Sequence, residues 1–319
     1  MAKHNQSKKP KVVVIGGGTG VFTVLTGLKK YPLDVAAVVT MADDGGSTGV
    51  LREEFGILPP GDVRRTLVAL AHTDNRMLSD LFNYRFEQGG LRGHTFGNIM
   101  LTALERLTGS FETAVDEASR ILGVDGEVLP VTYTNVRLCA ELEDGSVVRG
   151  ETNIDIPKHD GRLKIKRIFL DPPARLSRRA RAAITNADLI VVGPGDLYTS
   201  IIPNLVVRGV REAIRDSRAK KAYVVNLMTK WGETTGFSAK DFVGTVENYI
   251  GKGVLDYAII NTKRPSLQRL KHYEKESAEF VHANGMNSKP LPVLGDILRK
   301  RGFVRHDPEQ LAKVLVSLL

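Results

Sequence analysis

The stretch VVVIGGGTGVFTVLTGL, from Val12 to Leu28, joins four β-prone residues to a loop rich in glycine. Val-Val-Val-Ile is typical of a parallel strand covered on both faces, and the apolar residues after the glycines predict a helix. The first free N–H groups of such a helix, with the positive end of its dipole, favour an anion, most often a phosphate. The residues expected to bind it are Gly16, Gly17, Gly18 and Gly20.

The spacing of these glycines matches neither of the two common nucleotide motifs. A dinucleotide fingerprint needs a third glycine three residues after the second, and counting from Gly16 or Gly18 gives Val21 or Thr23 there. No Gly-Lys-Ser/Thr follows at the distance that a Walker A loop needs. The loop therefore predicts a phosphate site whose ligand stays open, with a tight strand-to-helix turn as the simpler alternative.

The composition is that of a globular protein with anionic partners. The 319 residues are 42% hydrophobic and 25% charged, with a formal net charge of +9. The basic residues are scattered and not interleaved with aromatic ones, which argues against nucleic acid as a partner. Cys139 is the single cysteine, so no intramolecular disulfide can form, and no apolar run approaches the roughly 20 residues of a membrane span. We expect a cytoplasmic protein with a flexible polar tail over residues 1–10.

Short apolar strands alternate with helical stretches along most of the chain. Strands are predicted at 12–15, at 35–40, from Leu163 and near residues 188, 222 and 256. Helices are predicted at 62–71, with Asp62 as cap, 77–86, 97–107, 111–122 and from Asp307 onward. The segments VRLCAEL and SVVRG flank Glu-Asp-Gly and predict a hairpin. The expected fold is α/β and Rossmann-like: a doubly wound, mostly parallel sheet in one domain, residues 11–319, with a small antiparallel hairpin insertion at about 130–171.

Polar loops that contain glycine follow three of the predicted strands. They are Met41–Gly49, Gly193–Ser200 and Leu227–Thr234. Ligands of open α/β sheets bind beyond the carboxyl ends of the strands, so these loops are expected to converge on one site.

The first of these loops carries the adjacent carboxylates Asp43 and Asp44 beside the proposed phosphate site. Two acids there repel each other and the phosphate unless a cation, a hydroxyl donor or an amine is present, and Mg²⁺ held by one carboxylate and phosphate oxygens would resolve this conflict. The simpler alternative is that the pair begins a turn. Ser47 can donate to a phosphate or cap the next helix.

The second loop supplies free N–H groups, two hydroxyls and a phenol, and Asn226 stands at the end of the next strand. The ordinary alternative is a capped turn. The candidate ligand contacts in this loop are Gly193, Pro194, Gly195, Leu197, Tyr198, Thr199 and Ser200.

Further candidates lie between these loops. Arg64 can reach a phosphate, and Asn98 can read a base or a hydroxyl. His94 is the obvious acid or base, although a single histidine at a helix start is more often structural.

Six motifs, in order, are GGGTG, MADDGGSTG, LPPGDVRR, GHTFGN, GPGDLYTS and NLMTKWGET. This set resembles the YvcK branch of the CofD-like family, the bacterial gluconeogenesis factors. The resemblance implies a Rossmann-like fold, a cytoplasmic location, binding of uridine-diphosphate (UDP) sugars, and a role in cell shape and wall morphogenesis during growth on gluconeogenic carbon sources. A related branch comprises 2-phospholactate transferases, which use a guanosine-diphosphate-activated substrate and Mg²⁺.

Roles carried over by position follow from the resemblance. The first-loop glycines and Thr19 would contact the nucleotide, and Asp43 and Asp44 match the acidic pair of the transferase branch. Asp196 stands where the family often has serine, and Lys230-Trp231 where glutamine and proline are expected, while Asn226 and Thr229 keep their roles. Tyr273 would stack on uracil, and Arg305 would meet a phosphate.

The sequence therefore favours a regulator that binds a UDP-sugar, with Mg²⁺ as a further ligand and a protein of wall synthesis or its regulation as partner. A homodimer is compatible with the resemblance. The alternative is a Mg²⁺-dependent transferase of the 2-phospholactate transferase type, with Asp43, Asp44 or His94 in the chemistry. An NAD-dependent oxidoreductase ranks third, because the glycine spacing is wrong for it.

Overall fold

A computed structural model describes residues 9–72, 76–284 and 289–319. In this part of the chain the central sheet has seven parallel strands in the order β10-β9-β8-β7-β1-β2-β3. The strands are β1 Lys11–Gly16, β2 Asp34–Val39, β3 Glu127–Pro130, β7 Leu189–Val192, β8 Lys220–Val224, β9 Tyr257–Asn261 and β10 Leu291–Gly295. This is the doubly wound order, with the switch point between β1 and β7.

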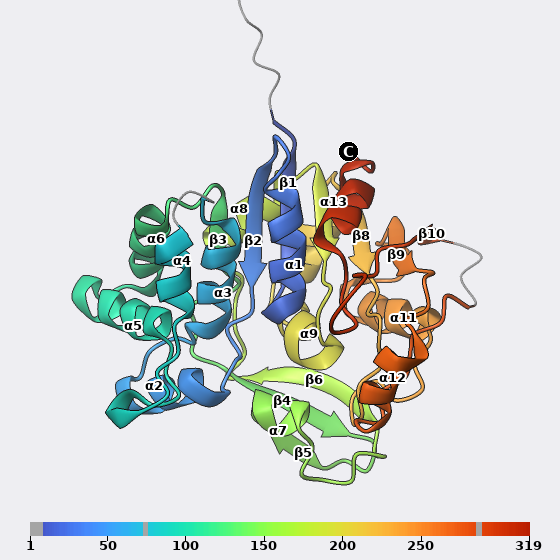
Figure 1. Cartoon of the computed structure of the whole chain (residues 1–319), viewed down its shortest axis with the longest axis horizontal. Coiled ribbons are helices and arrows are strands. Elements are labelled where there is room, and N and C mark those ends of the chain that lie inside the picture. Colours follow the sequence, from blue (N-terminus) through green and yellow to red (C-terminus); the bar gives the residue numbers. More distant parts are fainter. Residues whose placement is uncertain (1–8, 73–75, 285–288) are drawn as a thin grey trace, which may run out of the picture.

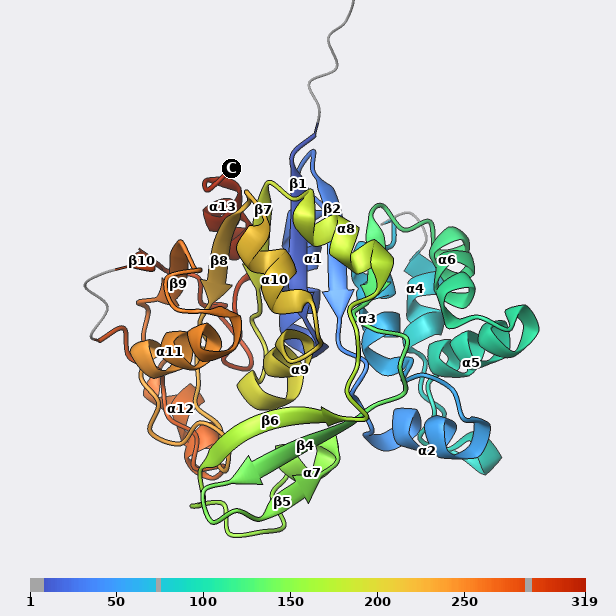
Figure 2. The same cartoon turned by 180° about the vertical axis from the view of Figure 1, so that it is seen from behind.

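Helices cover both faces of the sheet, as Figures 1 and 2 show from opposite sides. One face carries α1 Gly18–Leu28, α3 Gly61–Leu70 and α13 Pro308–Val316. The other carries α8 Arg178–Thr185, α9 Ile202–Leu205, α10 Val210–Asp216 and α11 Ala239–Ile250. At the two ends of the molecule lie α2 Gly46–Phe55, α4 Arg76–Asn83, the 3₁₀ turn Gly89–Leu91, α5 Phe96–Thr108 and α6 Phe111–Leu122 on one side, and α12 Leu267–Glu274 on the other.

A small antiparallel sheet lies beyond the carboxyl ends of the parallel strands (Figure 1). Its strand order is β5-β4-β6, so the predicted hairpin pairs with a third strand. We call this segment the insertion, and its elements are β4 Arg137–Leu142, β5 Val147–Arg149, α7 Glu151–Asp155 and β6 Ile165–Asp171. The insertion therefore lies opposite the loops that follow β1, β2, β7 and β8 (Figure 1).

The predicted fold class is confirmed, and the differences lie at the edges. Strands β3 and β10 were not predicted, because both are short edge strands with a proline, Pro130 or Pro292, which weakens the strand pattern. Helix α4 ends at Asn83, before the predicted end at residue 86. The tail expected over 1–10 falls mostly on residues 1–8, which lie outside the described residues.

The position of β1 in the core explains why its four central residues are all apolar. Val12, Val13, Val14 and Ile15 are all buried, because β1 is central in the sheet and covered on both faces. Helix α1 follows directly and packs against α3 and α13. This packing holds the glycine loop at the switch point of the sheet.

Candidate functional site

Two adjoining cavities lie at the switch point, beyond the ends of β1, β2, β7 and β8. The carboxylate cavity has a volume of about 560 Å³ and is lined by the glycine loop together with Asp43, Asp62 and Glu151. The aromatic cavity has a volume of about 650 Å³ and contains Tyr273 and Trp231. Both volumes are in the range of small-molecule sites. The residues that line both cavities, here called the waist, are Thr19, Gly20, Asp155, Ile156, Gly195, Asp196 and Arg305.

The glycine loop approaches the loop after β7 very closely. A Cβ atom at Gly20 would lie 2.0 Å from the carbonyl oxygen of Pro194, so only glycine allows this contact. Gly18 has a φ of 64°, in the left-handed region. The glycines thus bring the loops after β1 and β7 together, with Gly18 and Gly195 lining the same cavity.

One backbone amide expected to donate to a phosphate donates to a carboxylate of the protein instead. The amide of Gly18 donates to Asp62 Oδ1 at 3.0 Å. Asp62 was predicted to cap α3, which is wrong: the cap position is Pro60, and the Asp62 side chain turns toward the start of α1 instead. The Gly18 amide is therefore already engaged and is not free to donate to a phosphate.

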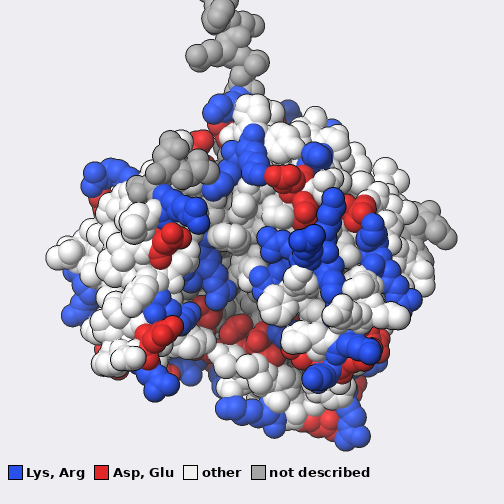
Figure 3. Space-filling view, viewed as in Figure 1, with Lys and Arg blue, Asp and Glu red and all other residues white. Residues whose placement is uncertain are grey.

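Five acids line the carboxylate cavity, and three of them, Asp43, Asp62 and Glu151, lie outside the waist. Burial and the neighbouring Asp43 raise the pKa of Asp62 to about 6, and the same two causes raise the pKa of Glu151 to about 9. Asp43 itself accepts a hydrogen bond from the amide of Gly45 at 3.0 Å. Figure 3 shows acidic side chains in the hollow above the insertion. Oxygen ligands of this kind suit Mg²⁺, which uses one or two carboxylates together with phosphate oxygens.

Asp44 has a different task from Asp43. Its Oδ1 accepts hydrogen bonds from the amide and hydroxyl of Thr152, both at 2.9 Å, and its Oδ2 accepts from the amide of Glu151 at 3.0 Å. Asp44 therefore fixes the first turn of α7 and lines neither cavity. Of the predicted acidic pair, only Asp43 faces the cleft, together with Asp62.

Four further predicted residues contact each other rather than the cleft. Ser47 Oγ lies 3.0 Å from His94 Nδ1 and accepts from Asn98 Nδ2 at 3.2 Å. Arg64 donates from Nε to Asn98 Oδ1 at 3.0 Å and from Nη1 to Asn83 Oδ1 at 2.5 Å. This polar network joins α2, α3 and α5, and its members line neither cavity.

The loop after β7 divides between the cavities and the core. Thr199 and Ser200 line the carboxylate cavity, and Pro194 lines the aromatic one. Leu197 and Tyr198 are buried in the π-helical turn Leu197–Ile201. In the loops after β1 and β7, the predicted residues that line neither cavity are Gly16, Gly193, Leu197 and Tyr198.

The remaining predicted residues meet in the aromatic cavity. Asn226, Thr229, Tyr273 and Arg305 all line it. The Tyr273 hydroxyl accepts from the amide of Val304 at 2.9 Å, which fixes the segment before Arg305. Asn226 Oδ1 is buried and has no hydrogen-bond partner among the described residues.

Residues that sequence reasoning missed complete the site. His306 is buried in the wall of the aromatic cavity, and burial lowers its pKa to about 4, so it is neutral at neutral pH. Lys230 forms ion pairs with Asp155, with Asp196 at 3.1 Å and with Glu233 at 3.2 Å. Burial favours a low pKa for Lys230, but these three acids outweigh it and raise the pKa. The only sequence signal for Lys230 was its departure from the family pattern.

These features define a class of protein: a doubly wound α/β protein with a polar ligand cleft at the switch point of its sheet. Residues 12–295 match the family model described as 2-phospho-L-lactate transferase CofD. The chain belongs to this family, and the resemblance drawn from the six motifs is confirmed.

Close relatives cover almost the whole chain. A protein of Nostoc sp. strain PCC 7120 is 46% identical over 99% of this chain and 70% of its own length. A protein of Bacillus subtilis strain 168 is 42% identical over 98% of this chain and 99% of its own length. Both are described as gluconeogenesis factors. A crystal structure of a UPF0052 family member from Bacillus halodurans has a TM-score of 0.92 and 40% identity, covering 97% of this chain and 99% of that one.

Neither a helix suited to a membrane nor a cluster of metal-ligating side chains is present in the described residues. None of their helices combines the length and the apolar character that crossing a membrane requires. No group of three or more histidine, cysteine, aspartate or glutamate side chains in the same residues is arranged to hold a metal ion. Any Mg²⁺ at Asp43 and Asp62 would therefore need further oxygens from water or from a ligand.

Proposed function

We propose that the protein binds a UDP-sugar reversibly and acts as a regulator of cell shape and wall morphogenesis during gluconeogenic growth. The observation that carries the proposal is the pair of unlike cavities joined at the waist. A nucleotide sugar is a ligand with two unlike ends joined by a diphosphate, which matches this arrangement. The gluconeogenesis factors among the relatives support the physiological part.

The diphosphate would lie at the waist. Gly20 and Gly195 bring bare backbone close to it, and the guanidinium of Arg305 supplies a positive charge. Asn226 Oδ1, which has no hydrogen-bond partner in the described part of the chain, is suited to accept the N3–H group of uracil. The acids of the carboxylate cavity would accept hydrogen bonds from sugar hydroxyls.

A divalent cation would balance the acids of the carboxylate cavity. Its lining holds five acidic side chains, those of Asp43, Asp62, Glu151, Asp155 and Asp196, and two guanidinium groups. Glu151, with a pKa of about 9, is neutral at neutral pH, which leaves four acids to carry negative charge. A diphosphate adds further negative charge. Mg²⁺ held by Asp43, Asp62 and phosphate oxygens relieves the repulsion, so chelation with EDTA should weaken the binding of UDP-glucose.

A Mg²⁺-dependent transferase is the second candidate, and the family description favours it. The acids beside the glycine loop are placed where such an enzyme would hold its metal. A transferase releases a nucleotide product when acceptor and Mg²⁺ are present, whereas a regulator leaves the nucleotide sugar intact. Chromatography of UDP-glucose and of a guanosine-diphosphate-activated substrate after incubation separates the two.

The binding proposal is tested with two arginine variants of the same loop. Arg305 lines both cavities, whereas Arg299 is exposed and lines neither. We expect Arg305→Met to weaken UDP-glucose binding, measured by calorimetry, about tenfold or more, and Arg299→Met to leave it within twofold, because a charge-assisted hydrogen bond contributes about 1.5–3 kcal/mol. Saturation at a hundred times Kd should stabilise the wild type by about 2.7 kcal/mol. If every uridine nucleotide leaves the melting temperature unchanged, the proposal is contradicted.

The physiological part needs a test in cells. A strain without the gene should lose its shape on a gluconeogenic carbon source and grow normally on glucose. Complementation by the wild-type gene, but not by the Arg305→Met variant, would connect the phenotype to the cleft. Equal rescue by both variants would separate the physiological role from nucleotide binding.

A further inference from the structure

The two cavities differ in a way that fixes the direction of a bound nucleotide sugar. The lining of the carboxylate cavity, as far as the structure describes it, contains no aromatic side chain. The aromatic cavity contains Tyr273 and Trp231. A nucleobase needs a flat apolar partner, whereas sugar hydroxyls suit carboxylates. A ligand held by its diphosphate at the waist therefore places its base in the aromatic cavity.

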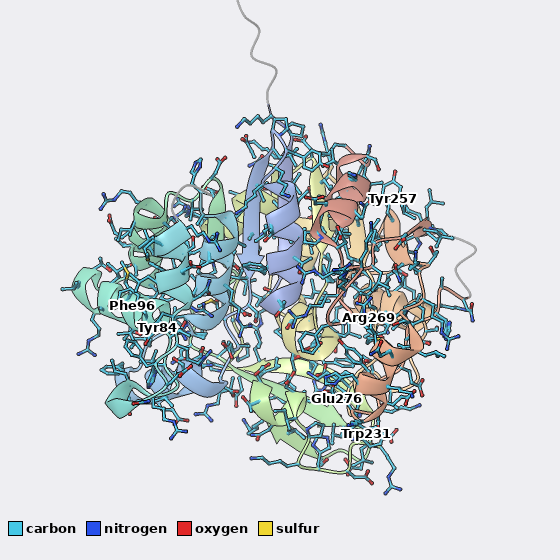
Figure 4. The ribbon with its side chains drawn as sticks, in the orientation of Figure 1. Tyr84, Phe96, Trp231, Tyr257, Arg269 and Glu276 are labelled. Carbon is cyan, nitrogen blue, oxygen red and sulfur yellow. The ribbon has the colours of Figure 1, made fainter. Side chains whose placement is uncertain are left out.

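Trp231 is exposed to an unusual degree for its position. It is the single tryptophan of the chain, and 40% of its surface is accessible although it lines a cavity. One edge of the indole packs against the insertion, because a Cβ atom at Gly161 would lie 2.6 Å from its Nε1. Figure 4 shows Trp231 and Glu276 where α12 approaches the insertion. An indole that is anchored along one edge and exposes two-fifths of its surface can receive a flat partner.

The loop that carries Trp231 is held on both sides. The amide of Lys230 donates to Thr234 Oγ1 at 2.9 Å, and the Lys230 ammonium pairs with Asp155 of the insertion. Thr229 exchanges hydrogen bonds with Glu279, its amide donating at 2.7 Å and its hydroxyl accepting at 2.8 Å. The indole is therefore positioned before a ligand arrives, which limits the ordering cost of binding.

We propose that Trp231 is the stacking platform for the nucleobase, with Tyr273 as the second aromatic side chain of the same cavity. The inference deepens the proposed function and rests on it. The ligand class is a nucleoside diphosphate sugar whose base stacks on Trp231 and whose sugar enters the carboxylate cavity. Stacking on an aromatic ring accepts any base, so Trp231 supplies affinity while polar groups such as Asn226 choose the base.

Intrinsic fluorescence tests this proposal in the wild-type protein, because Trp231 is the only indole. UDP-glucose and UMP should quench its emission with saturation, and glucose 1-phosphate should not. By calorimetry, Trp231→Ala should weaken UDP-glucose binding about five- to hundredfold and Trp231→Phe only a few fold, the range expected for base stacking. Tyr84→Ala is the matched control, since Tyr84 is half exposed and lies on the opposite side of the view in Figure 4.

The outcomes separate this inference from the proposed function. If calorimetry detects UDP-glucose but Trp231→Ala binds it as tightly as the wild type and the emission does not change, the inference is wrong and the function stands. If glucose 1-phosphate quenches the emission and UMP does not, the ligand lies in the reverse direction, which also overturns the inference. If no uridine nucleotide binds by either method, the proposed function itself fails. Thermal melting of the variants without ligand excludes unfolding as the cause of lost binding.

Discussion

Substituting Gly20 with alanine should destabilise the protein, against the usual trend for glycine in a helix. In an ordinary helix interior, Gly→Ala stabilises by about 0.5–1 kcal/mol. At Gly20 the new Cβ would lie 2.0 Å from the oxygen and 2.5 Å from the carbon of the Pro194 carbonyl, which are backbone atoms that no side-chain rotation can move. Overpacking of this kind costs about 1–3 kcal/mol, so we expect a net loss of about 1–2 kcal/mol.

Gly244 in α11 provides a matched control. It lies within a helix, has no positive φ, and nothing lies within 4 Å of its ideal Cβ position. Urea denaturation should therefore show Gly244→Ala to be more stable than the wild type, by about 0.5–1 kcal/mol, and Gly20→Ala to be less stable. Gly20→Ala should also lose affinity for UDP-glucose, because the two loops of the waist are forced apart. Equal stabilisation by both substitutions would refute the close approach of the loops after β1 and β7.

Three further predictions concern the walls of the cleft. Asp44→Ala should destabilise the protein in urea by about 1–3 kcal/mol, since three donors at the start of α7 lose their acceptor. Burial lowers the pKa of His306 from 6.5 to about 4, so the free energy of unfolding should fall by up to about 3 kcal/mol as the pH drops from 6.5 to 4. The fall should be smaller in His306→Gln, and urea titrations at several pH values measure both. Arg269 donates to the carbonyls of Arg299, Gly302 and Phe303 at 2.7–2.9 Å, so Arg269→Ala should speed amide exchange over residues 299–306 and Arg269→Lys should not rescue it.

The sequence predicted the backbone of the site well, because backbone signals are local. Four β-prone residues before glycine predict a buried strand that ends in a loop, and the structure has β1 ending at Gly16. Parallel strands place their carboxyl ends at one edge, so the convergence of the loops near Gly18, Gly195 and Asn226 followed from the alternation alone.

The directions of side chains could not be predicted in the same way. Asp43 and Asp44 are adjacent, yet one faces the cleft and the other caps α7, a helix that begins 107 residues later in the chain. The sequence predicts Asp62 as a helix cap, but its side chain accepts a hydrogen bond from the amide of Gly18 at the start of α1. In each case the partner is remote in sequence, so no local pattern records it.

The contrast between Arg64 and Arg305 shows how the charge balance selects the ligand contact. Both are arginines near proposed phosphate loops, but Arg64 is buried and spends its donors on Asn98 and Asn83. Arg305 is exposed and lines both cavities at the waist. Lys230, which lines only the aromatic cavity, already faces three carboxylates. Among the described residues Arg305 pairs with no acid, so under the proposed function an incoming diphosphate would meet an unmatched positive charge there, and its binding energy should depend on that side chain and on a divalent cation together.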